Sequence, residues 1–256
     1  FESMKPSFLN HDKPLICAMI QCRTADECIE KIKMSFIDGA EAFGIQLERL
    51  KRTERSDEHL KRIFAACENK PIYITSYRYS ENEGYSDDEC AELLLRGLKC
   101  GATLCDVIGD IYGRSPYYEL TVDEEAVKKQ TELIDKIHSL GGEVLISSHT
   151  LKNITKGETV MIAKKHIERG ADVIKIVNRA ESMAEVPMYL EAIQEITAMT
   201  DKKLLLLVSG EGQIIRYVGP NFGVCMYLCV QAHGELDTPE QPLITDILSV
   251  RDHIKV

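Results

Sequence analysis

The eight residues "GADVIKIV" (170–177) carry the strongest structural signal in the chain. Gly170 is typical of a helix end, and the apolar run after it predicts a strand that is buried on both faces. Lys175 interrupts this run with a side chain whose charge is costly to bury. Two alternatives follow: the amine reaches solvent at the end of the strand, or a pocket holds it for a purpose.

Seven other short apolar runs rich in β-formers accompany this one. Amphipathic stretches separate them, and helix start signals of the capping-box type are expected at Thr24–Glu27, Ser86–Glu89 and Thr121–Glu124. The expected strands span residues 15–20, 42–47, 71–77, 103–109, 143–149, 172–177, 203–209 and 223–230. Continuously apolar strands that alternate with helices indicate a parallel sheet covered on both faces.

Eight such units predict a (β/α)8 TIM barrel, with an open doubly wound sheet as the alternative. No Gly-x-Gly-x-x-Gly motif follows the first strand, which argues against a dinucleotide-binding fold. Without a linker or low-complexity segment, residues 1–256 form one domain. Residues 1–13 are interpreted as an N-terminal extension, whose first few residues we take for an addition to the natural chain.

The composition is that of an ordinary globular protein. The net charge of −10 argues against a general nucleic-acid-binding protein. The nine cysteines are an odd number and lie largely in apolar runs, so we expect them to be reduced in a cytoplasmic protein. No apolar stretch is long enough to cross a membrane, and we expect no membrane partner.

In a (β/α)8 barrel the active site lies at the carboxyl ends of the strands, so the polar residues there are the candidates for function. Singly, each has a structural explanation, such as a hydrogen-bonded histidine or a solvated arginine. Together, Lys175 and His149 lie on adjacent strands, with arginines on flanking strands. A desolvated lysine near other cations is a nucleophile towards ketones, a histidine moves protons near neutral pH, and an arginine binds a carboxylate.

Four stretches resemble the type I 3-dehydroquinate dehydratase family. They are "EVLISSHTL" (143–151), "GADVIKIV" (170–177), "SGEGQIIRYVGPNFG" (209–223) and "TSYRYSENEG" (75–84). The resemblance implies a dehydratase of the (β/α)8 class that needs no cofactor and no metal and acts on a small anionic keto acid. It also implies a homodimer.

The resemblance also implies roles for single residues. Lys175 would form an imine with the substrate ketone, and His149 would remove the adjacent proton and assist loss of the β-hydroxyl as water. Arg216 would hold the substrate carboxylate with help from Gln241, and Arg78 would line the pocket.

Several positions depart from the family pattern. On the second strand Gly44 and Gln46 replace a Glu-x-Arg pair, which leaves Gln46 as a candidate substrate contact. On the third strand Asn82 occupies the place of a glutamate near the catalytic histidine, and the adjacent Glu83 is a candidate to take that role. On the fourth strand Ile108 replaces a glutamate. In the last loop Asp237 replaces a serine, and an acid there would repel a carboxylate unless it were protonated or turned away.

Three functions are therefore compared. The first is dehydration of 3-dehydroquinate to 3-dehydroshikimate through an imine on Lys175. The second keeps the imine chemistry, as a dehydratase or aldolase-like enzyme, but changes the substrate to a related cyclic keto acid, because the residues that read the substrate are altered. The third is a barrel without catalysis that binds a metabolite or partner, which would not require both Lys175 and His149.

Overall fold

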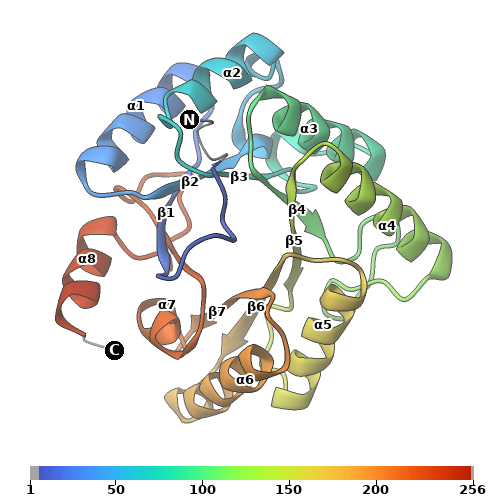
Figure 1. Ribbon diagram of the computed structural model, residues 1–256, viewed down its shortest axis with the longest axis vertical. Coiled ribbons are helices and arrows are strands. Elements are labelled where there is room, and N and C mark those ends of the chain that lie inside the picture. Colours follow the sequence, from blue (N-terminus) through green and yellow to red (C-terminus); the bar gives the residue numbers. More distant parts are fainter. Residues whose placement is uncertain (1–5, 255–256) are drawn as a thin grey trace.

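The computed structural model describes residues 6–254 and contains eight parallel strands surrounded by a ring of helices (Figure 1). The strands are β1 (Leu15–Ile20), β2 (Ala42–Gln46), β3 (Ile72–Thr75), β4 (Leu104–Ile108), β5 (Glu143–His149), β6 (Val173–Ala180), β7 (Lys203–Gly210) and β8 (Met226–Cys229). The helices are α1 (Ala25–Ile37), α2 (Asp57–Ala65), α3 (Asp87–Cys100), α4 (Glu124–Ser139), α5 (Lys156–Glu168), α6 (Val186–Met199), α7 (Ile215–Val218) and α8 (Ile244–His253). The predicted single-domain (β/α)8 barrel is confirmed.

The strands follow the order β7-β6-β5-β4-β3-β2-β1-β8, so each strand pairs with its neighbour in sequence and β8 pairs with β1. On the remaining side of the barrel, a short parallel bridge joins Leu204 on β7 to Val224, two residues before β8. The backbone N–H of Cys225 donates to the carbonyl of Leu204 there, at 2.7 Å. The barrel is therefore nearly closed.

The strand register determines which side chains face the barrel axis. Lys175 on β6 lies beside Ser147 on β5, and Asp106 on β4 lies beside Leu145 on β5. Side chains alternate along a strand, so Ser147 and His149 share the inward face with Lys175. The register thus brings the side chains of Asp106 on β4, Ser147 on β5 and Lys175 on β6 close together inside the barrel.

Two of the three expected capping boxes are confirmed, those of Thr24–Glu27 at α1 and Ser86–Glu89 at α3. The third is wrong: α4 is capped by Asp123, whose side chain accepts from the N–H of Ala126. Thr121 is buried, and its hydroxyl accepts from the N–H of Asp123 in the preceding loop. The threonine side chain therefore stabilises the loop and the helix begins two residues later than a box at Thr121 requires.

The N-terminal extension lies across one end of the barrel (Figure 1). Phe8 is buried in the core, and its N–H donates to the carboxylate of Glu143 at the start of β5, at 2.9 Å. The Ser7 hydroxyl donates to the same carboxylate. Residues 6–13 therefore pack as part of the domain, while the interpretation of the first few residues as an addition falls mostly on residues 1–5, outside the described part.

All nine cysteines lie between residues 6 and 254, and none of them forms a disulfide bond, in agreement with the expectation that they are reduced. No helix between residues 6 and 254 is long and apolar enough to cross a membrane.

Candidate active site

Lys175 is held inside the barrel, which answers the question raised by the sequence. Only 5% of its surface is exposed. Its Nζ atom donates to the hydroxyls of Tyr77 at 2.7 Å and Tyr73 at 3.0 Å, and lies 3.3 Å from Oδ2 of Asp106. The amine therefore has three partners of defined position and does not extend to the rim.

Asp106 is the buried centre of this cluster. Its Oδ2 atom accepts from the hydroxyls of Tyr73 and Tyr77, and its Oδ1 atom accepts from Ser147 at 2.5 Å. Burial alone would raise the pKa of this carboxyl group, but the charges of Lys175 and His149, together with these hydrogen bonds, outweigh burial and place the pKa below its ordinary value. Asp106 is thus an anion, and Lys175 pairs with it instead of with the cations that we expected beside the lysine.

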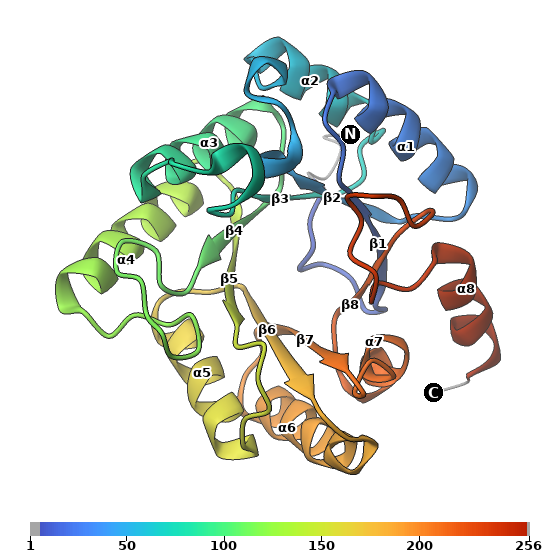
Figure 2. The same ribbon diagram turned by 180° about the vertical axis from the view of Figure 1, so that it is seen from behind.

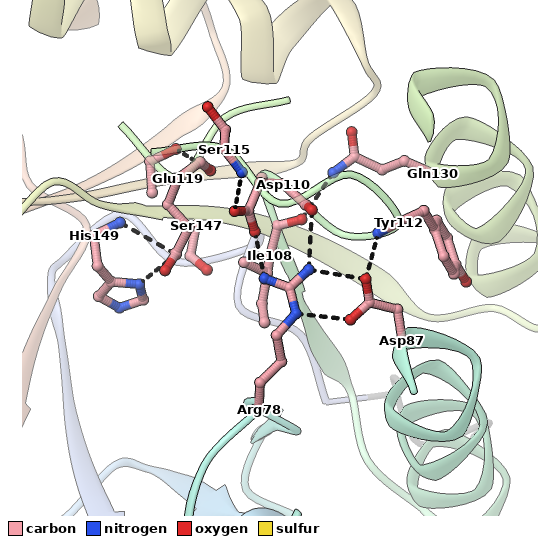
Figure 3. Close-up of polar contacts among 12 residues, drawn as sticks. Arg78, Asp87, Ile108, Asp110, Tyr112, Ser115, Glu119, Gln130, Ser147 and His149 are labelled. Atoms are coloured by element: carbon pink, nitrogen blue, oxygen red, sulfur yellow. Dashed lines mark hydrogen bonds and ion pairs between the residues drawn. The ribbon is translucent and has the colours of Figure 1, made fainter. Parts of the chain in front are cut away.

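His149 lies at the end of β5, two residues beyond Ser147. Its Nδ1 atom is 2.8 Å from Oε1 of Glu119, and the same oxygen accepts from the His149 N–H at 3.3 Å (Figure 3). The imidazole ring meets the Tyr77 ring edge-on, with centroids 5.3 Å apart. Glu119 therefore orients the imidazole from the loop between β4 and α4, and the sequence interpretation did not include it.

Glu83 and Asn82 have other surroundings. The Glu83 side chain is exposed, and its backbone carbonyl accepts from Arg52. Asn82 is fully buried, donates to the Tyr77 carbonyl at 2.9 Å and accepts from Arg55 at 2.6 Å. The carboxylate that His149 contacts comes from Glu119, and a role for Glu83 at the histidine stays a prediction.

The Arg78 guanidinium is bound by two acidic residues (Figure 3). It donates to both carboxylate oxygens of Asp87 at 2.7 and 2.9 Å, to Oδ1 of Asp110 at 2.7 Å and to the Asp110 carbonyl at 2.9 Å. These partners lie at the start of α3 and in the loop after β4, so the guanidinium joins that helix to that loop. Arg78 thereby anchors the loop that carries Glu119, whereas its lining of the pocket stays a prediction.

Arg216 and Gln241 are buried polar residues near the carboxyl ends of β7 and β8. Arg216 exposes 6% of its surface, and its Nε atom has no hydrogen-bond partner. Gln241 exposes 5%, and its Oε1 atom also lacks a partner. Gln213, two residues before α7, donates to the Glu240 carbonyl at 3.1 Å, and this hydrogen bond joins the chain near Arg216 to the chain near Gln241. Burial lowers the pKa of Arg216 to about 10, so the guanidinium remains a cation at neutral pH.

The second strand is tightly packed at Gly44, the position where the resembled family has a charged residue. A Cβ atom at Gly44 would lie 2.3 Å from the Met19 sulfur and 3.0 Å from a ring carbon of Tyr73. The space for a longer side chain is therefore already filled by β1 and β3. Gln46 is buried at the end of β2, and its Oε1 atom lies 3.5 Å from the Tyr79 hydroxyl.

The Asp237 carboxylate forms an ion pair with a lysine of α1. It lies in the loop between β8 and α8, which Figure 2 shows beside β1. Both of its oxygens accept from Lys31 on α1, at 2.8 and 2.9 Å, and Oδ2 also accepts from the Gly234 N–H. Nearby, Gln21 at the end of β1 donates to Thr238 at 3.3 Å. The loop is thereby closed against β1 and α1 with its acid neutralised.

Comparison with known proteins gives a consistent family. No curated protein matches the chain by sequence. A solved 3-dehydroquinate dehydratase from Geobacillus kaustophilus HTA426 is similar in structure, with a TM-score of 0.78, 17% identity and coverage of 95% of this chain and 92% of that chain. The type I enzyme from Clostridium difficile, solved with covalently modified comenic acid, has a TM-score of 0.78, 22% identity and coverage of 95% and 93%. At these identities the likeness shows the fold.

The enzyme from Enterococcus faecalis adds a third match, with a TM-score of 0.77, 16% identity and coverage of 98% of this chain and 99% of that chain. The family assignment rests on sequence: the model of the type I 3-dehydroquinases matches residues 16–256, which include β2 to β8, all of β1 except Leu15, and the Lys175 cluster. The chain therefore belongs to the type I 3-dehydroquinase family of dehydratases.

Proposed function

We propose that this protein dehydrates 3-dehydroquinate to 3-dehydroshikimate through an imine on Lys175. One observation carries the proposal: a buried lysine amine faces the barrel axis, and His149 follows on the same face of the neighbouring strand. An amine held in this way can attack a ketone, and the iminium that forms is an electron sink for a carbanion at the adjacent carbon. The family assignment supports the same reaction.

The other residues have roles that follow from their chemistry. His149 takes the proton next to the iminium carbon and returns it to the departing β-hydroxyl, which leaves as water. Water then hydrolyses the imine and frees Lys175. Arg216 binds the substrate carboxylate, because its buried Nε–H has no partner and requires an acceptor. Gln241 assists through its amide NH2 group, which can donate to the same carboxylate. Asp106 neutralises the positive nitrogen of Lys175 and of the iminium.

A second candidate is supported by the filled space at Gly44. The same imine chemistry would then serve a related cyclic keto acid, since β2 provides Gly44 and Gln46 where the resembled family has two charged groups. An iminium on a lysine can serve any such elimination from a ketone, whereas the residues that contact the substrate select which ketone reacts.

The decisive experiment combines the protein with 3-dehydroquinate and borohydride, followed by intact mass and peptide mapping. An adduct on Lys175 is expected. A folded protein that gives no adduct with this ketone but gives one with a related keto acid would support the second candidate. Absence of any adduct would favour a barrel that binds a ligand without catalysis. A homodimer and a cytoplasmic location remain predictions beside this proposal.

His149→Ala is expected to separate imine formation from turnover. The variant keeps the Lys175 cluster, so borohydride should still trap an adduct, while kcat falls by about 10²- to 10⁴-fold because the proton-transfer group is gone. Trapping and steady-state rates on the same preparation provide the measurement. If the variant turned over at the wild-type rate, His149 could not be the base.

Glu119→Ala is expected to lower kcat on the order of 10²-fold while the trapped adduct still forms, because a misplaced imidazole reacts poorly. Glu125→Ala is the matched control, since it removes the same group from an exposed position on α4, the helix that follows the loop of Glu119. Equal kcat values for the two variants would show that Glu119 does not position His149.

A further inference from the structure

Two tyrosine hydroxyls contact the reacting nitrogen, and the family's roles for lysine and histidine account for neither. Nζ of Lys175 donates to Tyr77 at 2.7 Å and to Tyr73 at 3.0 Å. Each hydroxyl in turn donates to Oδ2 of Asp106. The nitrogen and the carboxylate are thus joined by two parallel phenol bridges.

The two phenols differ in their depth along the barrel. Tyr73 lies within β3, pairs with Leu104 of β4 and is completely buried. Tyr77 lies two residues beyond the end of β3, exposes 8% of its surface and packs edge-on against the His149 ring. Substrate enters a (β/α)8 barrel from the carboxyl ends of the strands, so Tyr77 lies on the substrate side of Nζ and Tyr73 lies on the far side.

The hydrogen bonds of Asp106 allow Tyr77 to change partner. The carboxylate also accepts from Tyr73 and Ser147, and it pairs with Lys175. Rotation of the Tyr77 O–H about its C–O bond therefore leaves the buried anion with three partners. The Tyr73 O–H, enclosed beneath the lysine, has no corresponding position to which a substrate oxygen could come.

We propose that Tyr77 is a third catalytic residue beside Lys175 and His149, which relays protons between Nζ of Lys175 and the ketone oxygen while the imine forms and is hydrolysed. The inference rests on the imine chemistry of the proposed function. It assigns proton transfer during formation and hydrolysis of the carbon–nitrogen bond to Tyr77. Removal of the proton next to the iminium carbon and loss of the β-hydroxyl remain with His149.

The proton balance closes without an external reagent. The ammonium of Lys175 starts with three protons, and the iminium nitrogen retains one of them. The nitrogen bonds to the carbonyl carbon, the carbon–oxygen bond breaks, and the oxygen leaves as water with the other two protons. In each transfer Tyr77 gives its phenolic proton to the oxygen and receives one from the nitrogen, so that the phenol is regenerated. Hydrolysis reverses these steps.

The electrostatic surroundings suit a relay that never rests as a phenolate. Burial, followed by the negative charge of Asp106, raises the pKa of Tyr77 well above its ordinary value. The phenol therefore stays protonated and gives up its proton only as another arrives.

Tyr77→Phe and Tyr73→Phe form a matched pair, because each removes one hydroxyl that contacts both Nζ and Asp106. Adduct formation is measured by rapid mixing of each full-length variant with 3-dehydroquinate and quenching with borohydride at timed intervals. Tyr77→Phe is expected to slow the trapped adduct by about 100-fold or more, and Tyr73→Phe by far less. Circular dichroism establishes that both variants are folded.

A second measurement does not depend on the stability of the phenylalanine variant. Incorporation of 3-fluorotyrosine at position 77 keeps the size of the side chain and makes the phenol more acidic. The rate of adduct formation at a fixed pH should then change, because the rate of a proton transfer depends on the acidity of the group that transfers it. A purely structural tyrosine would leave this rate at the wild-type value.

The outcomes separate this inference from the proposed function. Adduct formation at the wild-type rate in Tyr77→Phe, or with 3-fluorotyrosine at position 77, would overturn the relay and leave the imine mechanism standing. Absence of an adduct in the wild-type protein would overturn both, since the relay would then have no imine to serve.

Discussion

Lys175→Ala is expected to abolish the borohydride-trapped adduct and to lower kcat/KM by at least about 10⁴-fold, because the nucleophile is removed. Peptide mapping after borohydride treatment provides the measurement. A reducible adduct that persists on the variant would show that another amine forms the imine.

The same substitution should also cost stability. Asp106 is buried and loses Lys175 as its salt-bridge partner, and removal of one partner from a buried ion pair costs about 3–5 kcal/mol. The hydrogen bonds from Tyr73, Tyr77 and Ser147 remain and bring the loss towards the lower end of this range. Chemical denaturation measures the free energy of unfolding.

The stability loss should depend on pH in a defined direction. In the wild-type protein the pKa of Asp106 is lowered on folding, so its stabilisation is present at neutral pH and is lost as the pH falls through the folded-state pKa. Without Lys175, burial dominates and disfavours the carboxylate. The difference in unfolding free energy between variant and wild type should therefore shrink as the pH falls and Asp106 becomes protonated.

A double variant separates lost chemistry from lost stability. Lys175→Met with Asp106→Asn removes both charges and keeps similar side-chain volumes. It should recover most of the stability while it remains inactive. An active double variant would contradict the imine assignment.

Arg216→Met is expected to have opposite effects on binding and on stability. Loss of the buried cation should raise KM for a carboxylated substrate on the order of 10²- to 10³-fold. The free protein should become more stable by about 1–3 kcal/mol, because the Nε atom is buried without a partner and methionine needs none. Steady-state kinetics and denaturation provide the two measurements.

Gln241→Leu is the matched comparison for Arg216→Met. It removes a buried polar group without changing the charge, so its effect on KM should be smaller and of the same sign. An unchanged KM in Arg216→Met would remove the carboxylate role, whatever the change in stability.

Much of the fold could be predicted from the sequence because its signals are periodic. Each expected strand is present, and Lys175 and His149 occur in the most distinctive motifs, on neighbouring strands as expected. The error at Thr121 arose because a threonine can cap a helix or stabilise a loop, and only the folded chain shows which partner its hydroxyl finds.

The surroundings of Lys175 were harder to predict, since they depend on the phase of β3. Tyr73, Thr75 and Tyr77 alternate on one face of the strand, and this face is the inward one. Arg78 has the opposite phase and points to α3. Once it is known which alternate residues of β3 face the barrel axis, the tyrosines can be read from the sequence. Glu119, in contrast, lies in an irregular loop that gives no periodic signal.

The packing around Gly44 links β2 to the reacting nitrogen. A side chain at position 44 would displace the end of the Met19 side chain and press on the ring of Tyr73, whose hydroxyl accepts from Lys175. The substrate contacts that β2 can offer are therefore coupled to the position of the amine through one tyrosine ring, so that a change in one would be felt by the other.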